Sequence, residues 1–159
     1  MGAKGINFAE ELHVVNIIPP FGSDAATKNS DVFTLKGHAH ATIILTVGTQ
    51  GGSFTAKLYE CDNFTPSTAT AIATRVYKEE TALGDTLGAA VAVTAADGVA
   101  TAVANNIMYV FEVNADELTE GYPCLQLRLS DLDNTTYVSA VAILSGSRYA
   151  SDQSASAIA

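Results

Sequence analysis

Apolar and polar side chains alternate along most of this chain, and this two-residue period limits the possible folds more than any other feature. In the clearest segment, Leu125, Leu127 and Leu129 point one way, whereas Gln126 and Arg128 point the other. Successive side chains of a strand face opposite sides of a sheet, so the pattern is typical of a strand with one buried face. No segment sustains the 3.6-residue period of an amphipathic helix. The chain is therefore expected to be β-rich.

The same period predicts nine strands. They are expected at residues 12–17, 31–35, 40–47, 54–59, 71–78, 87–94, 107–113, 124–129 and 137–144. In the segment 40–47, Ile43 and Leu45 are expected to face inward, and Thr42 to face outward. The segment 137–144 is apolar at nearly every position, which is typical of a strand covered on both sides.

Turn-forming residues separate these segments. Pro19 and Pro20 predict a loop after the first strand, and the glycine-rich stretch 48–52 predicts a hairpin. Asn114 can cap, and Gly121 can end, a short helical turn over residues 115–120.

Length and spacing then indicate the fold class. A chain of 159 residues suits one domain. Eight or nine strands at intervals of 8 to 15 residues favour an all-β, antiparallel β-sandwich or jelly roll, which we expect over residues 12–149. Residues 1–11 and 150–159 lack the alternation and are expected to form flexible N- and C-terminal arms, either frayed or ordered against neighbouring subunits.

The charge balance bears on possible partners. Eight Lys and Arg against seventeen Asp and Glu give a formal net charge of −9. Such a surface repels phosphates and anionic lipids, so we expect no nucleic acid or membrane partner. No apolar run reaches the length of a signal-peptide core or a membrane helix, and we expect synthesis in the cytoplasm.

Three histidines are the candidate metal ligands. His38 and His40 would project from one face of a strand and could share a metal ion, but His13 is the only further histidine. Surface or subunit contacts explain them more simply. Asp131 and Asp133 resemble the start of a calcium loop, without the glycine and distant glutamate that such a loop needs. A polar turn is the simpler interpretation, so we assign no metal site and no cofactor.

Nothing in the sequence predicts an enzyme. Cys61 and Cys124 form no Cys-x-x-Cys motif and are expected to be buried free thiols on strands, unless an oxidising environment pairs them. No nucleophile elbow, phosphate-binding loop or dinucleotide motif is present, and the adjacent carboxylates do not form the spaced pair of a glycosidase. We therefore assign no catalytic or cofactor-binding residue.

Several segments, in one order across most of the chain, are similar to the capsid decoration (cement) proteins of tailed bacteriophages. They are residues 11–16 (ELHVVN) with the proline-rich loop, 36–42 (KGHAHAT), 58–67 (LYECDNFTPS), 109–118 (YVFEVNADEL), 121–123 (GYP), and 142–145 (AILS) with Arg148 and Tyr149. The resemblance implies a structural protein of the virion, on the outer surface of the capsid, that clamps neighbouring major capsid proteins and commonly assembles as a homotrimer.

We accordingly expect a non-enzymatic decoration protein whose partners are the major capsid protein and itself. Residues 1–11 and 150–159 are expected to contribute to those contacts. One alternative is a head–tail connector, tail or fibre component, and another is a ligand- or metal-binding β-sandwich module.

Overall fold

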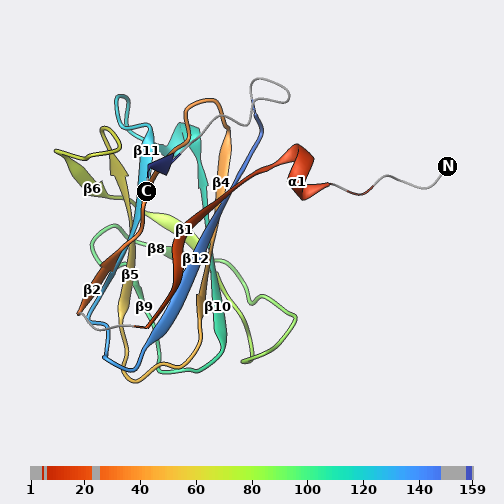
Figure 1. Cartoon of the computed structure of the whole chain (residues 1–159), viewed down its shortest axis with the longest axis vertical. Helices are drawn as coiled ribbons and strands as arrows, with labels where there is room; N and C mark the ends of the chain where they lie inside the picture. The colour runs from red at the N-terminus through yellow and green to blue at the C-terminus, as the bar shows by residue number, and fades with distance from the viewer. Residues whose placement is uncertain (1–4, 6, 23–25, 148–156, 159) are drawn as a thin grey trace.

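The computed structural model describes residues 5, 7–22, 26–147 and 157–158, and this part of the chain is mostly antiparallel strands (Figure 1). Two sheets pack face to face, which confirms the predicted all-β sandwich. Within the described residues the only helices are α1 (Phe8–Glu11) and the 3-10 turn η1 (Ala115–Glu117). None of these is long and apolar enough to cross a membrane.

The first sheet, sheet A, has six strands in the order β1, β12, β4, β10, β7, β8. Their bounds are β1 His13–Gly22, β12 Tyr137–Ser145, β4 His40–Val47, β10 Ile107–Asn114, β7 Thr74–Lys78 and β8 Val91–Val93. The second, sheet B, has the order β13, β3, β11, β5, β6, with β2 also pairing with β11 and β9 with β5. Their bounds are β13 Ala157–Ile158, β3 Val32–Thr34, β11 Cys124–Ser130, β5 Thr55–Cys61, β6 Ala69–Ala71, β2 Thr27–Asn29 and β9 Val99–Ala100.

The core lies between the two sheets and is built from every second residue of the long strands. On β4, Ile43 and Leu45 are fully buried while Thr42 is only partly buried, as the alternation predicts. On β11, Leu125 and Leu127 are likewise fully buried. Each such side chain contributes about 1.5–3 kcal/mol by leaving water, so the interleaved apolar rows hold the two sheets together.

The first strand continues through the two prolines, which corrects the predicted loop. β1 includes Pro19 and Pro20 and reaches Gly22, with register shifts against β12 on either side of Ile18. Proline cannot donate to a ladder, but β1 is the edge of sheet A, where one side of the strand needs no partner.

The chain crosses from one sheet to the other at two places where the sequence predicts that it stays in one sheet. The stretch 48–52 does not form a hairpin, because β4 belongs to sheet A and β5 to sheet B. The predicted strand 71–78 is split likewise: β6 ends at Ala71 in sheet B, and β7 begins at Thr74 in sheet A. Apolar alternation shows that a strand has a buried face, but both sheets bury a face towards the same core, so the pattern does not tell them apart.

Two other expectations for strands need correction. The segment 87–94 contributes only the three-residue β8, after an isolated bridge between Glu79 and Leu87. β12 is not covered on both sides by described residues, since Val141 and Ile143 remain partly exposed while the alternate side chains are buried. The predicted helical turn after Asn114 is present as the shorter η1.

The ends of the chain are described only in part. α1 leads into β1 and projects from the sandwich (Figure 1), and none of its residues is buried. Ala157–Ile158 pairs with β3 of the same chain. Residues 1–4, 6, 148–156 and 159 lie outside the described residues, so the predicted arms stay a prediction.

A buried polar network secures the crossing from β4 to β5. The Thr101 hydroxyl, on a side chain only 2% exposed, donates to the Phe54 carbonyl at 3.0 Å and accepts the Phe54 N–H at 3.0 Å. It also accepts the Gln50 side-chain amide at 2.8 Å. Gln50 in turn accepts the Ala104 N–H at 3.2 Å. One hydroxyl therefore satisfies several groups that water does not reach.

We predict that Thr101→Val lowers the free energy of unfolding by about 1–3 kcal/mol, because it keeps the side-chain shape but leaves the buried Phe54 N–H without its acceptor and removes one hydrogen bond from Gln50. Thr46→Val is the matched control, since Thr46 is exposed on β4 and its hydroxyl hydrogen-bonds to no described residue. It should change stability by less than about 0.5 kcal/mol. Urea unfolding of both variants measures this. Equal effects would show that the network does not stabilise the crossing.

Candidate functional site

His40 is the centre of a polar cluster on the outward face of sheet A. Its Nε2 lies 2.5 Å from Glu112 Oε2, and its Nδ1 lies 2.8 Å from Asn114 Oδ1. The Thr42 hydroxyl donates to the same Glu112 oxygen at 2.8 Å. Each ring nitrogen thus has a side-chain oxygen within hydrogen-bonding distance. The cluster is a hydrogen-bonded network within the protein.

Sequence reasoning missed Glu112 and Asn114 as partners of His40. The alternation along β10 already puts both residues on one face, but they are more than seventy positions from His40 along the chain. Only the register of β4 against β10, in which Asn114 pairs with His40 and Glu112 with Thr42, brings them together.

The structure separates the two histidines that the sequence grouped as candidate metal ligands. β4 begins at His40, so His38 precedes the strand rather than sharing its face. The buried His38 ring stacks on His13 instead, with 5.9 Å between the ring centroids. Within the described residues, no group of three His, Cys, Asp or Glu side chains is placed to hold a metal ion.

Asp131 and Asp133 lie in the turn that joins β11 to β12, as the simpler interpretation predicted. Asp133 Oδ1 accepts the Thr135 N–H at 3.0 Å and the Thr135 hydroxyl at 2.7 Å. These hydrogen bonds lower the pKa of the Asp133 carboxyl. Its oxygens therefore stabilise the turn.

Both cysteines are buried free thiols on strands, as predicted. Cys61 of β5 is directly opposite Cys124 of β11, and Val32 packs with them in a small cluster on the outer side of sheet B. Burial raises the pKa of Cys61 from 9.0 to about 11, and burial also raises the pKa of Cys124. The thiolate is the reactive form, so both groups are poor nucleophiles at neutral pH.

The Cys61 pKa predicts how stability depends on alkaline pH. A group whose pKa is raised on folding stabilises the fold fully below its unfolded pKa, here 9.0, and this contribution is lost as the pH rises towards about 11. We expect the free energy of unfolding to fall by about 1–3 kcal/mol across that window. Cys61→Ala should flatten the decline, measured by urea unfolding at stepped pH. An unchanged slope would contradict the assignment.

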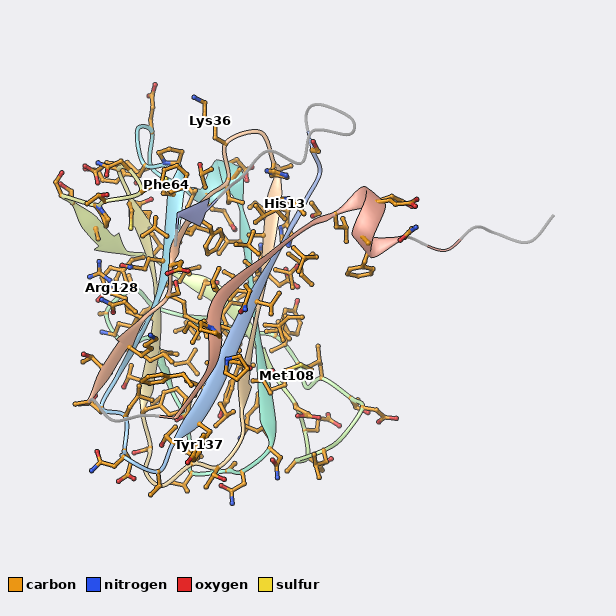
Figure 2. The ribbon with its side chains drawn as sticks, in the orientation of Figure 1. His13, Lys36, Phe64, Met108, Arg128 and Tyr137 are labelled. Atoms are coloured by element: carbon orange, nitrogen blue, oxygen red, sulfur yellow. The ribbon has the colours of Figure 1, made fainter. Side chains whose placement is uncertain are left out.

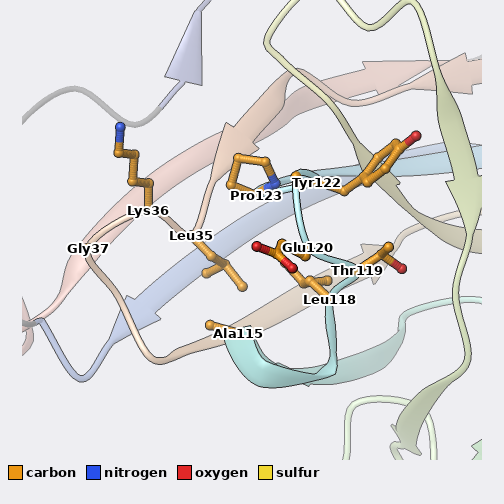
Figure 3. A pocket seen from close by; sticks show the side chains of 10 residues that line it. Leu35, Lys36, Gly37, Ala115, Leu118, Thr119, Glu120, Tyr122 and Pro123 are labelled. Atoms are coloured by element: carbon orange, nitrogen blue, oxygen red, sulfur yellow. The ribbon is translucent and has the colours of Figure 1, made fainter.

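A shallow pocket of about 230 Å³ lies beside η1, between residues 35–37 and 115–123 (Figure 3). Leu35 and Leu118 lie towards its middle, whereas Lys36 and Tyr122 point away at its two sides. Glu120 is the only acidic lining residue, and the lining contains no histidine or cysteine. The pocket can hold a small apolar group but offers no pair of groups for acid–base or nucleophilic chemistry.

The outward face of sheet A is a candidate contact surface. The register places Val141, Ile44, Val110 and Tyr77 in one row across β12, β4, β10 and β7. Neighbouring outward residues are Val14, Ser139, Ile143, Thr42, Thr46 and Met108. In Figure 2, Met108 lies on this side of the sandwich and Arg128 on the opposite side. The row makes the middle of the face apolar, with Val110 only 6% exposed and the other three side chains partly exposed.

The charged side chains at this face are held by partners within the protein. Glu112 is hydrogen-bonded to His40 and Thr42, and Arg75 donates to Glu117 Oε1 at 3.2 Å. The buried Glu79 carboxylate, next to β7, accepts the Met108 N–H at 3.0 Å. A sheet face with an apolar middle and satisfied polar groups is suited to contact with another protein.

Comparison of the chain with protein-family models, curated proteins and solved structures found no match.

Proposed function

We propose that this chain is a structural protein of a tailed-phage virion, which decorates the outside of the icosahedral head. In this role it clamps neighbouring major capsid proteins, assembles as a homotrimer and has no enzymatic activity. The order of the similar sequence segments supports the family, and the β-sandwich supports a rigid clamp.

The observation that carries the proposal is the outward face of sheet A. A backbone hydrogen-bond ladder across four strands holds the row formed by Val141, Ile44, Val110 and Tyr77. A surface fixed in this way loses little backbone freedom on binding. The β-branched side chains around the row also have few rotamers to lose.

A shell presents many equivalent binding sites, so each contact can be modest. Linked subunits that bind adjacent sites gain affinity through effective concentration rather than through one strong contact. An apolar row with a polar surround fits such a contact, since its burial favours binding and its edges remain hydrated. The net negative charge helps to keep unassembled protein soluble.

The first test is the number of copies per particle. We predict that quantitative mass spectrometry of purified virions finds this chain at a ratio to the major capsid protein of roughly one to three up to one to one, since avidity requires a layer over the whole shell. A handful of copies per particle would instead indicate a connector, tail or fibre component. Absence from the particle would contradict the proposal and favour a ligand-binding module.

A second test addresses the contact face itself. We predict that Ile44→Lys weakens binding to undecorated particles by at least about tenfold, because the lysine must lose water inside an apolar contact. Thr70→Lys is the control, since it adds the same charge at an exposed position of β6 in sheet B. Occupancy is measured by cosedimentation, with thermal unfolding to check the fold. Equal occupancy of the two variants would overturn the assignment of this face.

A further inference from the structure

The outward face of sheet B differs from that of sheet A, because it carries two cations side by side. Lys57 of β5 is directly opposite Arg128 of β11 in the strand register. Like charges at opposite positions destabilise a sheet. The chain has only eight Lys and Arg, and neither of these two forms an ion pair with any described residue. An anionic partner would offset their repulsion.

Arg128 is also held in place. Its guanidinium carbon lies 4.2 Å from the centre of the Tyr59 ring, and its Nε donates to Gln126 Oε1 at 2.8 Å. Gln126 is itself buried and anchored, because its amide donates to the Ser30 carbonyl at 3.0 Å. The contact with the Tyr59 ring and the Nε hydrogen bond together hold the guanidinium over the ring. Both terminal Nη groups are left without a hydrogen bond to described residues.

These side chains line a pocket of about 140 Å³ on three adjacent strands. Its lining consists of Thr27, Asn29, Lys57, Tyr59, Arg128, Leu129 and Ser130. A fixed guanidinium offers two parallel N–H donors that match the two oxygens of a carboxylate. The ammonium of Lys57 adds a second positive charge, although it also donates to the Ala96 carbonyl at 2.5 Å. The pocket thus has the chemistry of a carboxylate site.

We propose that this Arg128 pocket binds carboxylates of a second copy of the same chain, and that the contact assembles the oligomer. The inference rests on the homotrimer in the proposed function and names its interface. The source of the carboxylates follows from the charge balance, because seventeen acidic residues face only eight basic ones in every copy.

The connection between β7 and β8 is the acidic segment that fits best. Glu80 and Asp85 are exposed there and pair with no described cation. Leu83 between them is 81% exposed and can pack beside the pocket. A backbone bond from the Leu83 N–H to the Asn106 carbonyl, at 3.1 Å, holds the segment's shape.

The segment and the pocket belong to different sheets, so a contact between them joins two different surfaces. Contacts of this head-to-tail kind close into rings when the rotation between copies allows it. A three-membered ring would use each pocket and each acidic segment once. Leu83 lines a pocket with Thr46 and Met108 at one border of the sheet A face, so the segment occupies that border. The part of the row formed by Ile44 and Val141 would remain available for the shell.

The test is the mass of the purified full-length protein in solution, by light scattering and sedimentation velocity. We expect the wild type to associate, and Arg128→Gln to raise the dissociation constant by at least about tenfold. Lys36→Gln, which removes one positive charge from an exposed loop outside the pocket, should associate like the wild type. Circular dichroism and thermal unfolding confirm that each variant is folded.

A charge exchange tests the acidic segment. Arg128→Glu should abolish association. The double variant Arg128→Glu with Asp85→Arg should regain part of the association, because the ion pair is rebuilt with its charges exchanged. A monomeric wild type, an unchanged Arg128→Gln variant or a failed rescue would overturn the proposal. The copy number per virion is measured separately, so this failure is distinguishable from failure of the decoration role.

Discussion

The whole structure depends on two apolar sheet faces that must cover each other. Each sheet buries every second side chain, and neither face is stable in water without the other. Ile43 and Leu45 on one sheet and Leu58 and Leu127 on the other lie in this shared layer and are almost completely buried. Because the layer is formed from inward positions only, the outward positions of the same strands contribute little to it. They can therefore differ in chemistry without loss of the fold.

The two outward faces differ in that way. Sheet A presents an apolar row around Ile44 and Val141, with its charged side chains hydrogen-bonded within the protein. Sheet B presents Arg128 and Lys57 side by side, with no carboxylate partner among the described residues. One sandwich therefore carries one surface suited to an apolar contact and another suited to an ionic contact. In the proposed role, the first would contact the shell and the second would contact other copies of the chain.

The sequence predicted those features that depend on neighbouring residues. The bounds of β4 and the inward direction of Ile43 follow from alternation alone. Alternation does not indicate to which sheet a strand belongs, because strands of both sheets bury a face in the same core. For this reason the segment 71–78 was predicted as one strand. The Arg128 pocket shows the same limit. Alternation puts Gln126 and Arg128 on one face, but only the register against β5 adds Tyr59 and Lys57.

The two prolines in β1 have a consequence for contacts between copies of the chain. An edge strand with free N–H groups can recruit an identical strand from another molecule and start a fibre. Pro19 and Pro20 are consecutive, and successive strand residues direct their N–H groups to opposite sides, so together they remove one donor from each side of β1. The irregular register around Ile18 also interrupts the regular ladder there. Pairing of a second strand along the open edge is therefore disfavoured at this end of β1, and contacts between copies would depend more on side-chain surfaces.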